Sequence, residues 1–271
     1  MDNSGHIIVG GFLQFSTVFD DDFFNRSSAI TEIQVGGKLF FAEILGVCFT
    51  NLAGAELKNN GTVDFNTVIE TFAGTGLITG TGIFESTTVS GTSTFSPGAS
   101  PGQMTFNGGL TLEVSGGYLC EIFSPTSFDK ITGSNIMLGG TLTVSLEGHT
   151  PSVGEIFKIV ECESCSGNFT TLNLPILPIG QEWHIAYAPT TTTLVVAATG
   201  DIIWEGQIDA LWTHTANWKG GTIPSISDPV LIAPAPNPAR IESGVQITIG
   251  RLEVLLCAEF EVVLGGELTT N

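Results

Sequence analysis

Two cysteines separated by two residues form the most reactive pairing in the sequence, in the run Cys162-Glu163-Ser164-Cys165. A structural zinc site would need a second such pair, which the chain lacks. A redox-active pair would open a helix after a strand, and no helical pattern follows this one. We therefore expect a small structural disulfide between Cys162 and Cys165, in the loop after Ile159-Val160, with two reduced cysteines as the alternative.

The other three cysteines, Cys48, Cys120 and Cys257, lie far apart in the sequence. An odd and sparse set is not a disulfide framework. We expect these three to be buried singly, as small hydrophobic side chains. A bridge between Cys162 and Cys165 would favour an oxidising compartment.

Asp20, Asp21 and Asp22 make the densest acidic cluster of the chain. Calcium takes oxygen ligands, and three carboxylates could supply some of them. The spacing of an EF-hand loop and the Gly-Gly-x-Gly-x-Asp repeat are both absent, however. We expect a solvated loop at this cluster, keep a Ca²⁺ site as the alternative, and expect no other cofactor.

Three tryptophans, Trp204, Trp212 and Trp218, fall within fifteen positions. Such side chains could stack on sugar rings. Tryptophans gathered at the start of a module more often pack into its core or its cap. We therefore expect a core role, with carbohydrate stacking as the alternative.

The sequence carries no pattern of catalytic residues. The four histidines stand without a Ser-His-Asp or His-Glu arrangement. Polysaccharide lyases and hydrolases that use parallel β-helices need a basic proton acceptor or paired carboxylates. The basic residues are too few and too dispersed to indicate the first, and carboxylates paired by folding stay open as the second. We expect the protein not to be an enzyme.

The charge balance excludes two classes of partner. There are 8 Lys and Arg residues against 27 Asp and Glu residues, which gives a formal net charge of −19. A surface this acidic repels the phosphates of nucleic acids and of anionic lipids. No run reaches the roughly 18 apolar residues of a membrane-spanning helix. We expect neither a nucleic-acid partner nor a membrane span.

Short runs of alternating apolar and polar residues dominate the sequence, as in Leu110–Val114 and Thr141–Leu146. A glycine-containing turn precedes several of them, and successive turns lie roughly 20 to 30 residues apart, the length of one solenoid coil. The turns are Gly36-Gly37, Asn60-Gly61, Gly108-Gly109, Gly139-Gly140 and Gly265-Gly266. The pattern predicts an all-β protein, a right-handed parallel β-helix (β-solenoid) whose consecutive Gly-Gly strands pair in parallel; a tandem β-sandwich is the alternative.

The composition also divides the chain. Residues 1–148 are expected to form solenoid coils, and residues 149–199, whose strands are longer, an antiparallel β-strand segment that caps the open end of the stack. Residues 200–271 begin with the tryptophans and are expected to start a second, truncated β-solenoid module. The first residues lack a basic and an apolar region, so we expect them not to be a signal peptide. We expect both ends to have been cut from a longer protein, with export and anchoring signals elsewhere.

A run of motifs over residues 95–198 resembles a known type of surface protein. Phe95–Gly102 resembles the "SPG-x-SPG, then strand" signature of autotransporter-like β-helix passenger regions. In large bacterial surface proteins of the Bacteroidetes type, four further elements follow in a set order, and this chain has all four. They are Phe128-Asp129-Lys130-Ile131, the run 139–144, the run 154–159 and the run 166–175. The tryptophan-rich stretch from Trp204 to Asp228 is similar to the start of solenoid modules in such proteins.

This resemblance implies a non-enzymatic stalk or adhesin region of a large secreted or cell-surface protein. The expected location is extracellular or at the cell surface. The implied partners are neighbouring repeat modules of the same chain, and glycans or proteins of a host or matrix. A carbohydrate-binding or carbohydrate-active β-helix is the alternative function.

Overall fold

The computed structural model describes residues 2–15, 23–41, 49–64, 70–85, 89–98 and 100–271. The protein is all-β, with 56% of its residues in strands, and its parallel coils form a β-solenoid of about ten turns. Among the described residues, the helical elements are two 3₁₀ turns, η1 (Thr215–Asn217) and η2 (Lys219–Gly221), and no helix is long and apolar enough to cross a membrane. The predicted fold class is therefore confirmed.

The chain forms two compact units. Unit 1 comprises Met1–His149 and Ile159–Ile176, and unit 2 comprises Thr150–Lys158 and Leu177–Asn271. The segment 149–199, which the sequence analysis sets apart, is thus shared between the two units, and the strand β21 (Ile156–Gly167) contributes residues to both.

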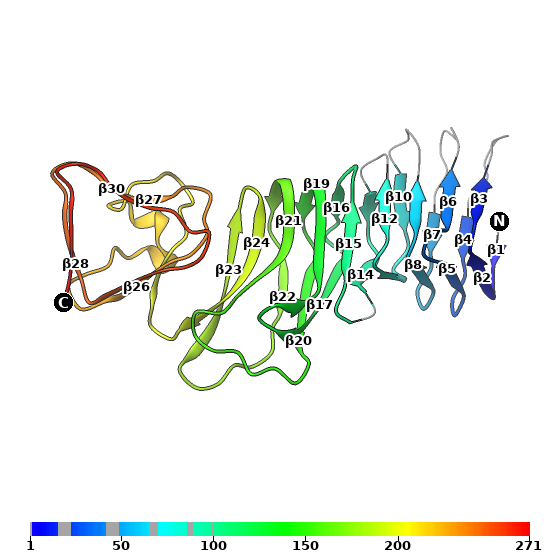
Figure 1. Cartoon of the computed structure of the whole chain (residues 1–271), viewed down its shortest axis with the longest axis horizontal. Helices are drawn as coiled ribbons and strands as arrows, with labels where there is room; N and C mark the ends of the chain where they lie inside the picture. The colour runs from blue at the N-terminus through cyan, green and yellow to red at the C-terminus, as the bar shows by residue number, and fades with distance from the viewer. Residues whose placement is uncertain (1, 16–22, 42–48, 65–69, 86–88, 99) are drawn as a thin grey trace. The chain divides into compact units, whose positions relative to one another are not determined.

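Each coil of unit 1 contributes strands to three faces, and the coils lie side by side in Figure 1, from β1 in blue to β22 in green. The first face contains β1 (Asp2–Asn3), β4 (Phe23–Asn25), β7 (Phe49–Asn51), β10 (Glu70–Ala73), β13 (Val89–Gly91), β16 (Leu110–Leu112) and β19 (Lys130–Leu138). The second contains β2 (His6–Val9), β5 (Ile30–Ile33), β8 (Glu56–Asn59), β11 (Leu77–Gly80), β14 (Thr94–Pro97), β17 (Gly117–Ser124), β20 (Thr141–Leu146) and β22 (Thr171–Asn173). The third contains β3 (Phe12–Phe15), β6 (Lys38–Phe41), β9 (Thr62–Asp64), β12 (Ile83–Glu85) and β15 (Gln103–Phe106).

Neighbouring coils pair in parallel, but the number of residues per coil differs along the stack. The paired residues Glu70 and Val89 are 19 positions apart (89 − 70), whereas Ile136 and Cys165 are 29 apart (165 − 136). At β19 the third and first faces merge, because one strand pairs with β15 through its first residues and with β16 near its end. Among the described strands of unit 1, β18 (Ser127–Phe128) is the one that pairs antiparallel, since it folds back on β17.

The core of unit 1 is a stack of side chains that repeat from coil to coil. Phe23 and Phe49 are register partners whose rings stack with centroids 4.9 Å apart, and Phe84 and Phe106 stack at 4.8 Å. These separations match the spacing of hydrogen-bonded strands, so the rings follow the coil repeat. Each buried Phe contributes about 2 to 3 kcal/mol relative to an exposed one.

A ladder of buried asparagines runs along one corner of unit 1, at the end of the first-face strands. Asn3 Nδ2 donates to Asn25 Oδ1 at 2.8 Å, and Asn25 Nδ2 donates to Asn51 Oδ1 at 3.0 Å. Asn25 also donates to the Glu56 carbonyl at 2.8 Å, and Asn51 to the Leu77 carbonyl at 2.8 Å. These bonds satisfy backbone carbonyls at a corner where strand pairing ends.

The glycine turns stand at different corners. Gly36-Gly37 precedes β6 on the third face, Gly108-Gly109 precedes β16 on the first face and Gly139-Gly140 precedes β20 on the second face. The strands that follow the last two therefore do not pair with each other: β16 pairs with β19, and β20 pairs with β17, in parallel in both cases. The expected parallel pairing is confirmed for β6 and β9, which follow Gly36-Gly37 and Asn60-Gly61. It is wrong for β16 and β20, because the turns before them stand at different corners and do not mark successive coils. The expected positive φ is found at Gly109 (109°) and Gly140 (61°), among others.

Unit 2 combines an antiparallel hairpin with further parallel coils. The hairpin joins β23 (Gln181–Ala188) to β24 (Thr191–Ala198), which confirms the antiparallel pairing predicted for the longer strands. After it, β25 (Ile202–Trp204), β26 (Pro229–Ile232) and β29 (Arg251–Val254) form one face. The two other faces pair β27 (Ala239–Ile241) with β30 (Phe260–Val262), and β28 (Gln246–Ile249) with β31 (Glu267–Thr270).

Candidate functional site

A buried carboxylate, Asp129, joins three segments of unit 1 just before β19. Its Oδ1 accepts the backbone N–H of Gly102 at 2.8 Å, and its Oδ2 accepts that of Glu121 at 3.0 Å. Its own backbone carbonyl accepts the hydroxyl of Tyr118 at 3.1 Å. Glu121 lies in β17, so Asp129 ties the loop that ends at Gly102 to the second face.

Burial dominates the electrostatics of this junction. Desolvation raises the pKa of Asp129 from 3.8 to about 6, and the two backbone hydrogen bonds oppose that rise. Burial also raises the pKa values of the Tyr118 phenol and the Cys120 thiol, and the negative charge of Asp129 adds to both shifts. The phenol and thiol are therefore neutral at physiological pH, which makes them poor nucleophiles. The junction fixes the loop that ends at Gly102 to the second face.

This junction gives a physical meaning to two of the motifs that carry the resemblance. Gly102 ends the run Ser96-Pro97-Gly98-Ala99-Ser100-Pro101-Gly102, and Asp129 stands in the later run Phe128–Ile131. The hydrogen bond from Gly102 to Asp129 brings the two runs into contact. Ser100 makes a second tie, because its hydroxyl donates to the carboxylate of Glu121. The two motifs therefore supply a loop, which ends at Gly102, and the carboxylate of Asp129 that anchors it.

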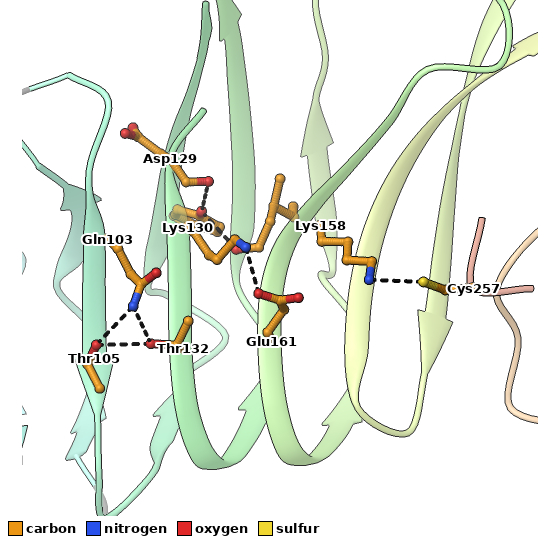
Figure 2. A network of polar contacts seen from close by, with 10 residues as sticks. Gln103, Thr105, Asp129, Lys130, Thr132, Lys158, Glu161 and Cys257 are labelled. Carbon is orange, nitrogen blue, oxygen red and sulfur yellow. Dashed lines mark hydrogen bonds and ion pairs between the residues drawn. The ribbon is translucent and has the colours of Figure 1, made fainter. Parts of the chain in front are cut away.

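Polar side chains on the outer side of the coils connect neighbouring coils, as Figure 2 shows. Thr105 and Thr132 are register partners whose hydroxyls lie 3.0 Å apart, and Gln103 Nε2 reaches the Thr132 hydroxyl at 3.3 Å. Lys130 Nζ forms an ion pair with Glu161 Oε2 at 2.6 Å. Such outward ladders add cross-strand stability.

Seven of the eight cationic side chains pair with carboxylates. Lys38 lies 2.7 Å from Asp64, whose hydrogen bond raises the pKa of Lys38, and Arg251 lies 2.6 Å from Asp201. The other five are Arg26, Lys58, Lys130, Lys219 and Arg240. Within the described part of the chain, Lys158 is the exception, since its Nζ donates to the sulfur of Cys257 at 3.1 Å.

A groove of about 520 Å³ lies on the second face. One acid lines it, Glu56, whose Oε1 accepts the Thr79 hydroxyl at 2.6 Å. Glu32, on the neighbouring strand, lies 3.4 Å from His6 and 3.5 Å from Lys58. The groove is lined by Gly54, Ala55, Glu56, Thr75, Leu77, Thr94 and Leu119. With a single acid in its lining, this groove does not present the facing carboxylates that a glycoside hydrolase uses.

A second cavity, of about 420 Å³, lies in unit 2. Lys158 and Cys257 both line it, together with Glu259 and residues of the proline-rich loop 233–238. Cys257 occupies an exposed turn and has a positive φ of 67°, which is uncommon for a residue other than glycine. No sequence pattern indicates this pair, because 99 positions separate the two residues.

The structure places the predicted cysteines in three different settings. Cys162 and Cys165 form a disulfide, within the strand β21 rather than in the expected loop. Cys120 is buried, as expected. Cys257 is exposed, so the expectation of burial is wrong there: it belongs to the turn after β29 and not to the inner side of a coil. Cys48 lies outside the described residues, as do Asp20, Asp21 and Asp22, the candidate calcium ligands.

The three tryptophans form the core of unit 2. Trp204, Trp212 and Trp218 are at most 1% exposed. Trp218 contacts the rings of the other two edge-on, at 4.9 and 4.6 Å, and its Nε1 donates to the Trp212 carbonyl at 2.8 Å. Burial leaves none of these rings accessible to a sugar, which overturns the alternative of carbohydrate stacking.

An acid and a histidine meet in the loop between Trp204 and Trp218. Asp209 Oδ2 lies 2.6 Å from His214 Nδ1, and Asp209 Oδ1 accepts the amide of Asn217 at 2.8 Å. The backbone N–H of Leu211 also donates to Asp209, and this bond is the largest cause of the lowered pKa of its carboxyl group. No sequence pattern indicates a partner for His214, and the structure shows that its partner is Asp209. The pair closes the loop that leads to Trp212 and Trp218, which pack against each other.

Among the described residues, no group of three or more His, Cys, Asp or Glu side chains could hold a metal ion. In comparisons with known proteins, no protein-family model matches the chain and no curated protein matches it significantly.

Proposed function

We propose that this chain is a non-enzymatic structural region, a stalk, of a large secreted or cell-surface protein. The observation that carries the proposal is the stacking of parallel coils around a continuous core in unit 1, joined by outward polar ladders. Coils of this kind contact only their neighbours, so length can be added without changing the fold. The resemblance of residues 95–198 points to the same class of protein.

The coil formed by β29, β30 and β31 supports a continuing stack. Ile232 and Ile241 are fully buried by this coil, whereas their register partners on it, Val254 and Val262, are each 43% exposed. In the described residues, each of these three strands pairs along one edge. An unpaired edge beside half-exposed core positions suits a further coil. We propose that the partner of this edge is another repeat module of the same kind.

An extracellular location is part of the proposal. The Cys162–Cys165 disulfide requires oxidising conditions to persist. The net charge of −19 and the small number of lysines suit an exposed protein surface that must stay soluble.

An appended coil tests whether the edge accepts a module. A copy of residues 250–271, one coil of 22 positions (251 − 229), is added after Asn271. Amide hydrogen exchange in β29–β31 should slow, because each strand gains a second partner. The matched control is the same copy with lysine at the positions equivalent to Val254 and Val262, which cannot enter the core. Equal exchange in both proteins would contradict a continuing stack.

A catalytic role is tested separately, by incubation of the protein with a panel of neutral and acidic polysaccharides. No cleavage is expected. Cleavage that the Glu56→Gln variant loses and the Glu267→Gln control keeps would replace the stalk by a carbohydrate-active protein whose site is the groove on the second face.

A further inference from the structure

Lys158 and Cys257 form an isolated pair of nucleophiles in a cavity of unit 2. The Lys158 Nζ atom lies 3.1 Å from the Cys257 Sγ atom. Figure 2 draws this contact as a dashed line. Both side chains line the cavity of about 420 Å³, so small solutes from solvent can reach them. Four prolines in the lining, Pro189, Pro234, Pro236 and Pro238, restrict the motion of the walls.

In the part of the chain that the structure describes, Lys158 is not paired with a carboxylate, and Cys257 is not bridged to another cysteine. The other seven cations pair with carboxylates, whereas Lys158 faces a thiol. Among the described cysteines, Cys120 is buried and the Cys162–Cys165 pair is bridged, which leaves Cys257 as the accessible thiol. An exposed thiol is the cysteine form that oxidants reach first.

We propose that Lys158 and Cys257 are a modification site at which dioxygen forms a covalent link through one oxygen atom, Cys257 Sγ–O–Nζ Lys158. The Lys158 ammonium first releases a proton to solvent. The thiol then loses its hydrogen and the amine loses one of its two. One oxygen atom of O₂ becomes the bridge, and the other leaves as water with those two hydrogens. Sulfur and nitrogen each lose two electrons, and O₂ gains four.

The separation of the two atoms favours a bridge over the other oxidation products. A direct S–N bond would require a closer approach than one interposed oxygen does, starting from the 3.1 Å contact. A lone sulfenic acid would persist only until it met a nucleophile, and the amine of Lys158 is already in place. The link would tie the turn that carries Cys257 to the start of β21, within unit 2.

Peptide mapping of the air-exposed protein tests the link. Trypsin cleaves after Lys and Arg, so a modified Lys158 leaves residues 131–219 uncleaved and joined to residues 252–271. The joined peptide should be about 14 Da heavier than the sum of its two parts with Cys257 as a thiol and the Cys162–Cys165 disulfide kept, since the link adds one oxygen and removes two hydrogens; a direct S–N bond would make it about 2 Da lighter. The Cys162–Cys165 disulfide lies in the same peptide. A parallel sample is therefore reduced and alkylated before digestion. In that sample the link should be cleaved, and the joined peptide should be absent.

Two variants decide between the link and ordinary thiol oxidation. Lys158→Arg keeps the charge but lacks the primary amine, and Cys257→Ser lacks the sulfur. Both variants should be cleaved normally after residue 158 and should give no joined peptide. Lys219→Arg, at a lysine paired with Glu182, is the control and should keep the link. The proposal is overturned if wild-type Cys257 is recovered only as sulfinic or sulfonic acid, as a disulfide between two chains, or as unmodified thiol after exposure to air.

Discussion

Asp129 Oδ1 accepts the backbone N–H of Gly102 at 2.8 Å, across 27 positions of sequence. The same carboxylate accepts the N–H of Glu121 through its other oxygen. One buried side chain thus anchors a loop to the second face of the solenoid. Burial of its carboxylate is unfavourable when the group is charged, so its effect on stability depends on pH.

Replacing Asp129 should change how stability depends on pH. Its folded pKa, about 6, is above the ordinary value of 3.8, so folding favours the protonated form. The contribution of this group to stability is full below about pH 4 and is lost as the pH rises through 6, by about 3 kcal/mol at most. In Asp129→Asn that dependence is absent. The stability difference between wild type and variant, from urea unfolding, should therefore grow as the pH falls from 7 to 4. A constant difference over that range would contradict the raised pKa.

The asparagine ladder should be sensitive to the loss of one member. Asn25 donates to Asn51 Oδ1 and to the Glu56 carbonyl, and its own Oδ1 accepts from Asn3. Asn25→Ala leaves buried polar groups without partners and should lower the free energy of unfolding by about 2 to 4 kcal/mol. Asn173→Ala, at an exposed asparagine of β22, should change it by less than about 0.5 kcal/mol. Urea unfolding of the two variants provides the comparison; equal effects would argue against a structural ladder.

The core of unit 2 should depend on its tryptophans. Trp218 is 1% exposed and packs between Trp204 and Trp212. Trp218→Ala should cost about 3 to 5 kcal/mol through the cavity it leaves. Trp218→Phe should cost less, because it keeps most of the volume and loses the hydrogen bond to the Trp212 carbonyl. Thermal unfolding measures both. Added mono- and oligosaccharides should not alter the fluorescence of these buried rings, and a saturable change that is absent in Trp218→Phe would restore the sugar-stacking alternative.

How far the sequence predicts this structure depends on the range of the interactions. Alternation in runs such as Leu110–Val114 and Thr141–Leu146 predicts strands, and Gly109 and Gly140 mark corners, because these are local effects of backbone and side-chain geometry. The assignment of each corner to a face is not local. It depends on the length of the preceding strands, and β19 passes from one face to the next without a turn.

The candidate sites show the same limit. The contact of Gly102 with Asp129 and that of Lys158 with Cys257 join residues 27 and 99 positions apart. The motifs that resemble known surface proteins place Gly102 and Asp129 in order but do not show that they touch. Nothing near Cys257 in the sequence signals Lys158, and the apolar residues around that cysteine favoured burial; its place in a turn, with positive φ, put it at the surface instead.

His184 should make unit 2 sensitive to acid, in the direction opposite to that of Asp129. Burial, and then the charge of Lys219, lower the pKa of His184 from 6.5 to about 4. Folding therefore favours the neutral imidazole. Its contribution to stability is full above pH 6.5 and is lost as the pH falls through 4, by about 3 kcal/mol at most. His184→Gln should weaken this dependence, and Lys219→Gln should weaken it less, because burial is the larger cause.

Hydrogen exchange resolved by peptide separates the two effects, since a single unfolding curve for the whole chain would add contributions of opposite sign. Between pH 6.5 and 4, after correction for the intrinsic exchange rate, protection in β23 and β24 should fall in the wild type and stay nearly level in His184→Gln. Over the same range, protection in β17 and β19, which flank Asp129, should rise in the wild type and stay nearly level in Asp129→Asn. Parallel responses of both segments in the wild type would show that one general charge effect, rather than these two buried groups, governs the pH dependence.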